Sequence, residues 1–329
     1  MNENEQCTPK ETGENLLGID IGGTKCAVIY GIKRGDALTI ADKDKFPTTE
    51  VNETLARICA ATKAMMQKHS LSPDNTRAIG ISCGGPLDSR KGVVMSPPNL
   101  PGWDNIPITD IIRQQTSIPA FIQNDANACA MAEWKFGAGR GTQNMVFLTF
   151  GTGLGAGIIA NGQIYTGAND NAGEVGHIRL SDFGPVGYGK AGSFEGFASG
   201  GGIAQLARIR LSELHQMGGR VGWCTPDELP QLTTKQVTDA AAAGDPLAIE
   251  VIQTSARYLG VGLSVIIDIL NPEAIVIGGV FARREAMFRP QMEDVLRREA
   301  LPGARSVCRI VPAELGEAIG DYAALSVAG

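Results

Sequence analysis

Apolar residues follow two kinds of spacing along the chain, one typical of strands and one typical of helices. Short apolar runs predict strands at Leu16–Ile21, Cys26–Ile32, Ala78–Ser82, Ala120–Gln123, Met145–Phe150, Ala156–Ala160 and Ala274–Ile277. Apolar residues spaced three and four apart predict helices at Asn52–His69, Ala126–Phe136, Ile203–Gln216, Pro246–Leu270 and Glu285–Arg298. Because the strands alternate with helices, the pattern predicts an α/β protein.

One strand–turn–strand pattern occurs twice. An apolar strand leads through Gly22-Gly23-Thr24 into a second strand, and another does so through Gly151-Thr152-Gly153, about 130 residues later. The repetition predicts a duplicated architecture with one hairpin in each of two domains. A cleft between two related domains is a natural site for a nucleotide.

Length and charge narrow the class of protein. The 329 residues are 43% apolar, enough to bury a large core, which excludes a disordered chain. The 29 Lys and Arg against 35 Asp and Glu give a net charge of −6 and argue against a nucleic-acid or membrane-surface partner. Neither a signal peptide nor a membrane span is predicted, and the seven scattered cysteines predict reduced thiols in a cytoplasmic protein.

The two repeated turns have the composition of phosphate-binding loops. Glycines let a phosphate approach the backbone N–H groups, and threonine adds a hydroxyl. Ordinary hairpin turns also favour these residues, but the similarity of the two turns favours phosphate binding. Neither turn is GxxxxGK[ST] or a GxGxxG that opens a helix, which disfavours P-loop and hydride-transfer chemistry.

Asp20 lies on the first strand, directly before the first of these turns. A carboxylate there suits Mg²⁺ bound beside nucleotide phosphates, directly or through water. The alternative is an aspartate that stabilises the turn by accepting backbone hydrogen bonds.

From Asp20–Lys25 onward the sequence resembles the ROK (repressor, open reading frame, kinase) family of sugar kinases. The resemblance continues through Pro98–Trp103, Asn124–Ala128, Gly151–Gly155, Ala172–His177, Ile275–Val280 and Leu315–Glu317, in that order over about residues 16–325. It implies a glucokinase-like enzyme with the two-lobed, actin-like or hexokinase-like (ribonuclease H-like) α/β fold and its central cleft.

The resemblance also implies a division of the chain. A polar tail at 1–15 precedes a small lobe at 16–135, which regains a C-terminal helix at about 316–329, and a large lobe covers 136–315. ATP, Mg²⁺ and a hexose are the implied ligands, and a homo-oligomer, dimer or tetramer, is implied as well.

The family pattern assigns roles residue by residue. Asp125 would be the general base that takes a proton from the sugar hydroxyl, although a helix N-cap is its structural alternative. The implied sugar-binding residues are Gly85, Asn99, Asn124, Asp125, Glu174, His177 and Glu195. The implied ATP-binding residues are Gly22, Gly23, Thr24, Lys25, Gly151, Thr152, Gly153, Gly155, Gly278 and Gly279. Turn, helix-start and hydrogen-bonded core roles stay open for Asn99, Glu195 and His177 respectively.

One segment departs from the family pattern. Many members bind structural Zn²⁺ through a histidine and three cysteines, but Val186, Tyr188 and Ser193 stand at the cysteine positions here. His177 alone cannot hold zinc, so no structural zinc is expected. We expect packing of Val186, Tyr188 and Phe194 to hold the segment instead. Cys83, near the predicted sugar pocket, is expected to be a core thiol.

Glycine is in surplus, and much of the surplus is local. The chain has 42 glycines, and 19 of them lie between Gly137 and Gly202. We interpret this as backbone kept bare for phosphate and sugar. Gly200-Gly201-Gly202 precedes a predicted helix and has no assigned role.

Three functions compete. An ATP-dependent hexokinase acting on glucose is favoured, with N-acetylglucosamine or N-acetylmannosamine as alternative substrates. The repressor branch is set aside because only 19 residues precede Asp20, too few for a DNA-binding domain. A catalytically silent sugar-binding or regulatory protein is the alternative of another class.

Overall fold

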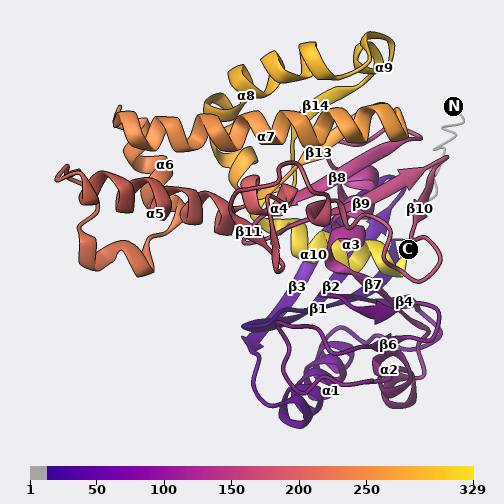
Figure 1. Cartoon of the computed structure of the whole chain (residues 1–329). Helices are drawn as coiled ribbons and strands as arrows, with labels where there is room; N and C mark the ends of the chain where they lie inside the picture. Colours follow the sequence, from indigo (N-terminus) through magenta and orange to yellow (C-terminus); the bar gives the residue numbers. More distant parts are fainter. Residues whose placement is uncertain (1–12) are drawn as a thin grey trace, which may run out of the picture. The chain divides into compact units, whose positions relative to one another are not determined.

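A computed structural model of the chain describes residues 13–329. The chain folds into two compact units: unit 1 extends to Ala128 and resumes at Ala318–Gly329, and unit 2 comprises Cys129–Glu317 (Figure 1). Of the polar tail expected at 1–15, residues 1–12 lie outside the described part, and Glu14 already belongs to the first strand.

Unit 1 is built on a five-stranded mixed sheet with the order β3-β2-β1-β4-β7. The strands β1, β2 and β3 form an antiparallel meander, whereas β1, β4 and β7 are parallel. The bounds are β1 Glu14–Ile21, β2 Lys25–Arg34, β3 Ala37–Pro47, β4 Thr76–Cys83 and β7 Ala120–Asn124, with a small hairpin of β5 Leu87–Asp88 and β6 Val93–Val94.

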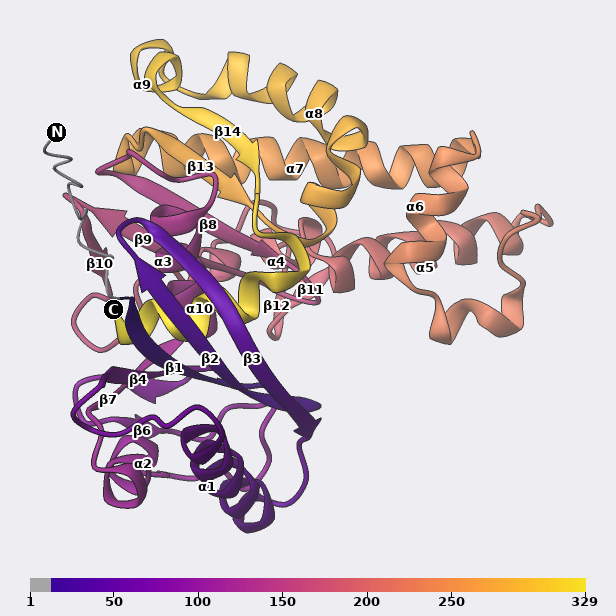
Figure 2. The same cartoon turned by 180° about the vertical axis from the view of Figure 1, so that it is seen from behind.

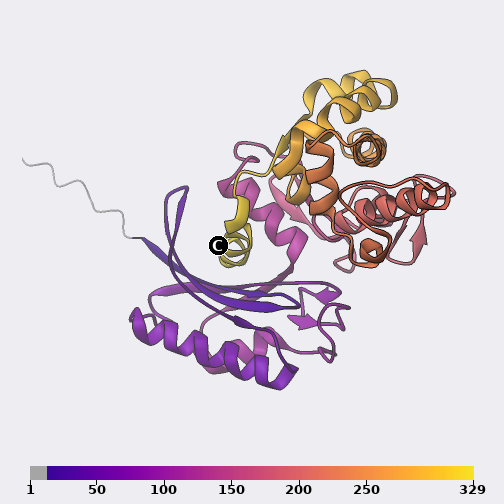
Figure 3. The same cartoon turned by 90° about the vertical axis from the view of Figure 1, so that its left-hand side faces the viewer.

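Helices cover both faces of this sheet (Figure 3). One face packs against α1 (Val51–Lys68) and α2 (Ile108–Thr116), and the other receives the C-terminal helix α10 (Ile319–Ala328). The second face is lined by glycine where the helix approaches: a Cβ on Gly80 would lie 2.1 Å from the carbonyl oxygen of Ala324. Bare strand backbone therefore admits α10.

Unit 2 repeats the same plan around the sheet β10-β9-β8-β13-β14. Its strands are β8 Met145–Phe150, β9 Leu154–Ala160, β10 Gln163–Tyr165, β13 Ala274–Ile277 and β14 Arg309–Pro312. The strands β8 and β9 form the hairpin equivalent to β1 and β2, and β13 and β14 are parallel to β8. The predicted repetition of the hairpin is thereby confirmed.

Most of the helices belong to unit 2, where α7 and α8 run side by side (Figure 2). Their bounds are α4 Phe194–Phe197, α5 Gly200–Gln216, α6 Thr234–Ala242, α7 Pro246–Leu270, α8 Gly279–Glu299 and α9 Pro302–Val307. The helix α3 (Asp125–Phe136) begins in unit 1 and ends in unit 2. Short elements complete the chain at β11 Val186–Gly187, β12 Lys190–Ala191, η1 Val175–His177, η2 Pro226–Gln231 and η3 Gly316–Ala318.

All the strands and helices predicted from apolar spacing are present. The ends of Met145–Phe150, Ala274–Ile277 and Pro246–Leu270 are as predicted, and those of the others are shifted. The predicted helix Glu285–Arg298 is the later part of α8, which has non-helical backbone at Arg284. The strand β3 was missed because it is an edge strand that contains the charged run Asp42–Lys45 in place of an apolar run. No helix within residues 13–329 has the length and apolar character needed to cross a bilayer.

Candidate active site

Three parallel strands of unit 1 end side by side, and the predicted chemistry of this unit lies at their ends. Ile21 of β1 pairs with Cys83 of β4, which pairs with Asn124 of β7. Asp20, the turn that follows β4 and Asp125 therefore share the carboxyl edge of one sheet. In α/β proteins this edge is where ligands bind.

Asp125 is the first residue of α3, and its neighbour Asn124 takes over the capping role. The Asn124 Oδ1 accepts a hydrogen bond from the N–H of Asn127 at 2.8 Å, and the Asp125 Oδ1 accepts one from Ala126 at 2.8 Å. Desolvation by surrounding protein raises the pKa of Asp125, although the residue retains surface open to solvent. Since Asn124 caps the helix, a base role for Asp125 is compatible with a stable helix start.

Asp20 belongs to a charged group that the sequence did not reveal in full. Burial raises the pKa of Asp20 to about 6, and the carboxylate of Asp321 adds to the rise, whereas Lys43 opposes it. Asp321 lies on α10 and forms an ion pair of 2.5 Å with Lys43 of β3. In the sequence Asp321 stands out as the single charged residue of the C-terminal helix.

The first phosphate turn contacts a predicted sugar-binding residue. A Cβ on Gly23 would lie 2.5 Å from the carbonyl oxygen of Asn99, and one on Gly84 would lie 3.1 Å from the Asn99 amide. The turn itself is closed by a hydrogen bond of 3.1 Å from the N–H of Gly22 to the carbonyl of Lys25. A Cβ on Gly85 would have no other atom within 4 Å, so the space beside this residue is open to a ligand. Unit 1 thus brings its predicted sugar and phosphate residues together.

The donors around Asp20 suit Mg²⁺. Carboxylate oxygens are hard ligands, and Mg²⁺ usually takes one or two of them while water and substrate phosphates supply the rest. Asp20 provides such an oxygen next to the first phosphate turn. Within residues 13–329 no three ligating side chains form a cluster.

The second phosphate turn lies in unit 2 and is held by the start of α5. The N–H groups of Gly200 and Gly201 donate to the carbonyls of Gly151 and Thr152 at 2.7 and 3.0 Å. Gly200-Gly201-Gly202 therefore does not precede the helix but forms its first turn, with Ser199 as the N-cap. Its role is close packing: a Cβ on Gly202 would lie 2.0 Å from the carbonyl oxygen of Gly196.

The paired glycines after β13 lie against the same turn. Gly278 donates to the carbonyl of Leu148 at 2.9 Å. Gly279 has φ +61, and a Cβ there would lie 1.9 Å from the carbonyl oxygen of Phe150 and 3.2 Å from the N of Gly151. Only glycine meets both demands. The predicted ATP-binding residues of unit 2 are thus contiguous.

Glu195 connects the second phosphate turn to the predicted sugar residues of unit 2. Its Oε2 accepts a hydrogen bond of 3.0 Å from the N–H of Leu154. A Cβ on Gly176 would lie 3.2 Å from the Glu195 Cβ, so the segment from Glu174 to His177 lies beside it. Glu174 and His177 are both exposed.

The prediction that Val186, Tyr188 and Phe194 hold their segment by packing is wrong for the first two residues. Phe194 is fully buried, and a Cβ on Gly262 would lie 2.3 Å from its ring, but Val186 and Tyr188 are 48% and 78% exposed. Hydrogen bonds hold the segment instead: the Gln205 side chain bonds both the N–H and the carbonyl of Val186, at 2.6 and 3.3 Å. The absence of structural zinc stays a prediction.

The Tyr188 ring lies edge-on to that of His177, with 6.3 Å between ring centroids. Lys190 donates to the carbonyl of His177 at 2.7 Å. These contacts connect the segment to a predicted sugar-binding residue.

The local glycine surplus is used in part by the protein itself. A Cβ on Gly173 would lie 2.1 Å from the carbonyl oxygen of Ala156, and one on Gly192 would lie 2.0 Å from that of Ser181. The interpretation that this backbone is bare for phosphate and sugar is therefore too narrow. Close approach of one loop to another also requires it.

Gly202→Ala is expected to lower the free energy of unfolding by about 2 kcal/mol or more, because its Cβ meets backbone that cannot turn aside. Chemical denaturation measures this change. Gly303→Ala is the matched control, since a Cβ there meets no atom within 4 Å. Equal stability of the Gly202→Ala variant and the unaltered protein would contradict the packing role.

Cys83, at the end of β4 in unit 1, is fully buried beside Asp20 and Asp125. Burial raises its pKa far above the ordinary value, and the charges of Asp125 and Asp20 add to the rise. A thiol of this kind is not a nucleophile at neutral pH. This agrees with the prediction of a core thiol.

The chain is similar to known glucokinases and to a transcriptional regulator. The ROK family model matches residues 16–328. A glucokinase of Halalkalibacterium halodurans is 33% identical over 309 residues, covering 92% of each chain. A ROK family glucokinase from Streptomyces griseus, solved with glucose and AMPPNP, is 29% identical with a TM-score of 0.73, covering 95% of this chain and 98% of that one. A ROK family transcriptional regulator, a homologue of the Escherichia coli Mlc protein, is 28% identical with a TM-score of 0.83, covering 97% of this chain and 78% of that one.

The fold is the predicted α/β fold of the actin-like, hexokinase type, and the protein is a sugar kinase. The chain belongs to the ROK family.

Proposed function

We propose that the protein transfers the γ-phosphoryl group of ATP to the 6-hydroxyl of glucose, with Asp125 as general base. The observation that carries the proposal is the shared carboxyl edge of β1, β4 and β7. Asp125, Asp20 and the first phosphate turn all lie at this edge of the sheet of unit 1. A base and a phosphate-binding turn are the parts that this reaction requires.

In this proposal Asp125 accepts the proton of the sugar hydroxyl as its oxygen attacks the phosphorus. The raised pKa of Asp125 makes its carboxylate a stronger base than an ordinary aspartate. The turns at Gly22–Lys25 and Gly151–Gly155 bind the phosphates, and Gly278 and Gly279 lie beside the adenosine. Asp20 holds Mg²⁺, which when bound neutralises phosphate charge.

Sugar recognition is assigned to the polar residues predicted from the sequence. Asn99, Asn124 and Gly85 serve in unit 1, and Glu174, His177 and Glu195 serve in unit 2. A site of this kind discriminates because a missing hydroxyl leaves its partners without a hydrogen bond. The glucokinase relatives favour glucose as substrate, and the S. griseus structure favours ATP as phosphate donor.

A coupled ADP-release assay tests the substrate. Glucose, N-acetylglucosamine, N-acetylmannosamine, mannose, allose and fructose would each be supplied with ATP and Mg²⁺. We expect glucose to give the highest kcat/KM. A higher value for either N-acetylhexosamine would replace glucose by that sugar.

The second candidate is a catalytically silent sugar-binding or regulatory protein. The observation that favours it is the similarity to the transcriptional regulator. Sugar binding measured by calorimetry, together with no sugar-dependent release of ADP for any sugar of the panel, would select it.

A further inference from the structure

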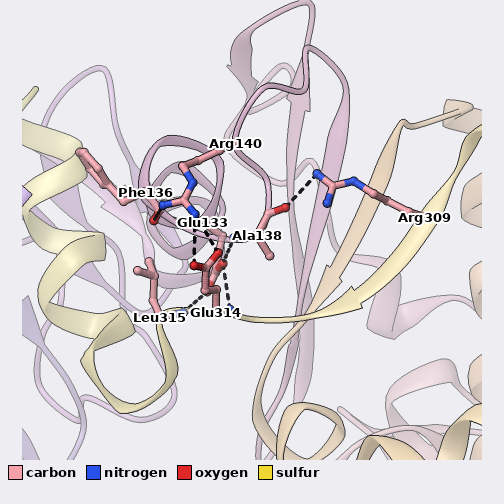
Figure 4. A network of polar contacts seen from close by, with 7 residues as sticks. All are labelled: Glu133, Phe136, Ala138, Arg140, Arg309, Glu314 and Leu315. Atoms are coloured by element: carbon pink, nitrogen blue, oxygen red, sulfur yellow. Dashed lines mark hydrogen bonds and ion pairs between the residues drawn. The ribbon is translucent and has the colours of Figure 1, made fainter. Parts of the chain in front are cut away.

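Glu133 is a buried carboxylate for which the proposed chemistry has no use. It lies in the last turns of α3 and is fully buried. Its Oε2 accepts hydrogen bonds from the N–H groups of Ala138 and Glu314 at 2.8 and 3.2 Å, and its Oε1 accepts one from Leu315 at 2.9 Å (Figure 4). The partners are backbone amides of two segments that are far apart in the sequence. A buried charge held in this way is costly to disturb.

The two segments are those through which the chain enters and leaves unit 2. The helix α3 crosses from unit 1 between Ala128 and Cys129, and the chain returns to unit 1 after Glu317. Glu133 follows the first crossing, and Glu314 and Leu315 precede the second. One carboxylate thus joins both crossings inside unit 2.

Each crossing leads directly to a residue of the site in unit 1. The helix that contains Glu133 begins with Asp125. The segment after Leu315 continues into α10, where a Cβ on Gly320 would lie 3.2 Å from the Asp20 Oδ2. The position of the base and the support of Asp20 are therefore both connected to the Glu133 carboxylate.

Neighbouring contacts are weaker and lie at the surface. Arg140 bonds the carbonyl of Phe136 at 3.0 Å and Glu314 at 3.1 Å, but the Arg140 and Glu314 side chains are 57% and 53% exposed. Exposed ion pairs contribute little. Gly137 keeps room for the buried carboxylate, because a Cβ there would lie 2.1 Å from the Glu133 Oε2.

We propose that Glu133 is a positioning residue for phosphoryl transfer: it fixes the two crossings to each other and thereby the alignment of Asp125 with Asp20 and the first phosphate turn. The proposal rests on the proposed kinase reaction. Misalignment by a fraction of an ångström lowers the rate of a positioned reaction more than it lowers ground-state binding. The effect should therefore fall on kcat.

Glu133→Gln tests this, with Glu314→Gln as matched control. The amide oxygen still accepts hydrogen bonds, but the NH₂ group faces backbone donors. We expect a folded variant whose kcat is at least about fivefold lower than that of the unaltered protein and whose sugar KM changes less than about twofold. Its backbone amides at Ala138, Glu314 and Leu315 should exchange faster with deuterium. Glu314→Gln should match the unaltered protein in all three measurements.

Three results would overturn the proposal. They are an unchanged kcat despite faster exchange, a rise in sugar KM with unchanged kcat, and an equal loss of kcat in the Glu314→Gln control. If Glu133→Gln does not fold, Glu133→Asp keeps the charge and should show the same selective fall in kcat; failure of both variants to fold would make Glu133 a stability residue only. Absence of sugar-dependent ADP release by the unaltered protein overturns the kinase reaction instead, and the exchange measurement still reports on the crossings.

Discussion

Replacing Asp125 by asparagine is expected to reduce kcat by about 10³-fold, because the amide cannot accept the proton of the sugar hydroxyl. The fold should be retained, since the asparagine Oδ1 can still accept the hydrogen bond from Ala126 and Asn124 still caps the helix. The measurement is kcat in the coupled assay, accompanied by thermal unfolding. Sugar binding measured by calorimetry should persist.

The matched control is Asp110→Asn. Asp110 lies in the first turn of α2 in the same unit, is 54% exposed and pairs with Arg113 at 2.9 Å. Its replacement should leave kcat unchanged. A kcat of Asp125→Asn within about tenfold of that of the unaltered protein would remove Asp125 from the base role.

Asp20→Asn is expected to have opposite effects on stability and activity. The pKa of Asp20 is raised from 3.8 to about 6, so the fold favours the neutral carboxyl. Its contribution to stability is complete below about pH 4 and is lost as the pH rises through 6. Asparagine stays neutral and avoids this loss, so the metal-free variant should be more stable than the unaltered protein at pH 8, by up to about 3 kcal/mol.

Activity should fall in the same variant by about 100-fold, because the carboxylate that would hold Mg²⁺ is gone.

Urea denaturation in EDTA at pH 4 and pH 8 measures the stability difference between Asp20→Asn and the unaltered protein. Asp44→Asn is the control, since the Asp44 side chain is only partly buried, at 37% exposed, and pairs with Arg57 at 2.9 Å. A stability difference between Asp20→Asn and the unaltered protein that is the same at both pH values would contradict the assignment. Burial is the main cause of the raised pKa of Asp20; the charges of Asp321 and Asp125 add to the rise, and those of Lys43 and Lys25 oppose it.

The raised pKa of Asp20 illustrates the cost of a functional site. The residue that the proposed reaction needs ionised is held where ionisation lowers native stability. Natural proteins accept such a cost at sites where the charge is used.

The sequence predicted the strand ends and the turns because they are local features. A strand that ends in Asn124-Asp125, or one that ends in glycine and threonine, is recognisable from neighbouring residues alone. The missed residues share a different property. Lys43, Asp321 and Glu133 act through partners that are 181 to 278 residues away, as in the contacts of Glu133 with Glu314 and of Lys43 with Asp321.

The segment at Val186 and Tyr188 shows why packing could not be predicted. Both side chains are apolar or aromatic and were expected to be buried, yet they are exposed, and the Gln205 side chain holds the backbone. The apolar character of a side chain favours its burial. The residues that the fold brings next to it decide whether it is buried.

The sequence by itself determined the α/β class, the duplicated hairpin and the positions of Asp20, Asp125 and the two phosphate turns, because spacing and turn chemistry act over a few residues. Only the tertiary structure decided that Asn124 caps α3, that Gly200 and Gly201 bond the second phosphate turn and that Glu133 joins the two crossings. Hydrogen bonds and close contacts between distant segments depend on distances of a few ångströms, and these exist only once the chain has folded.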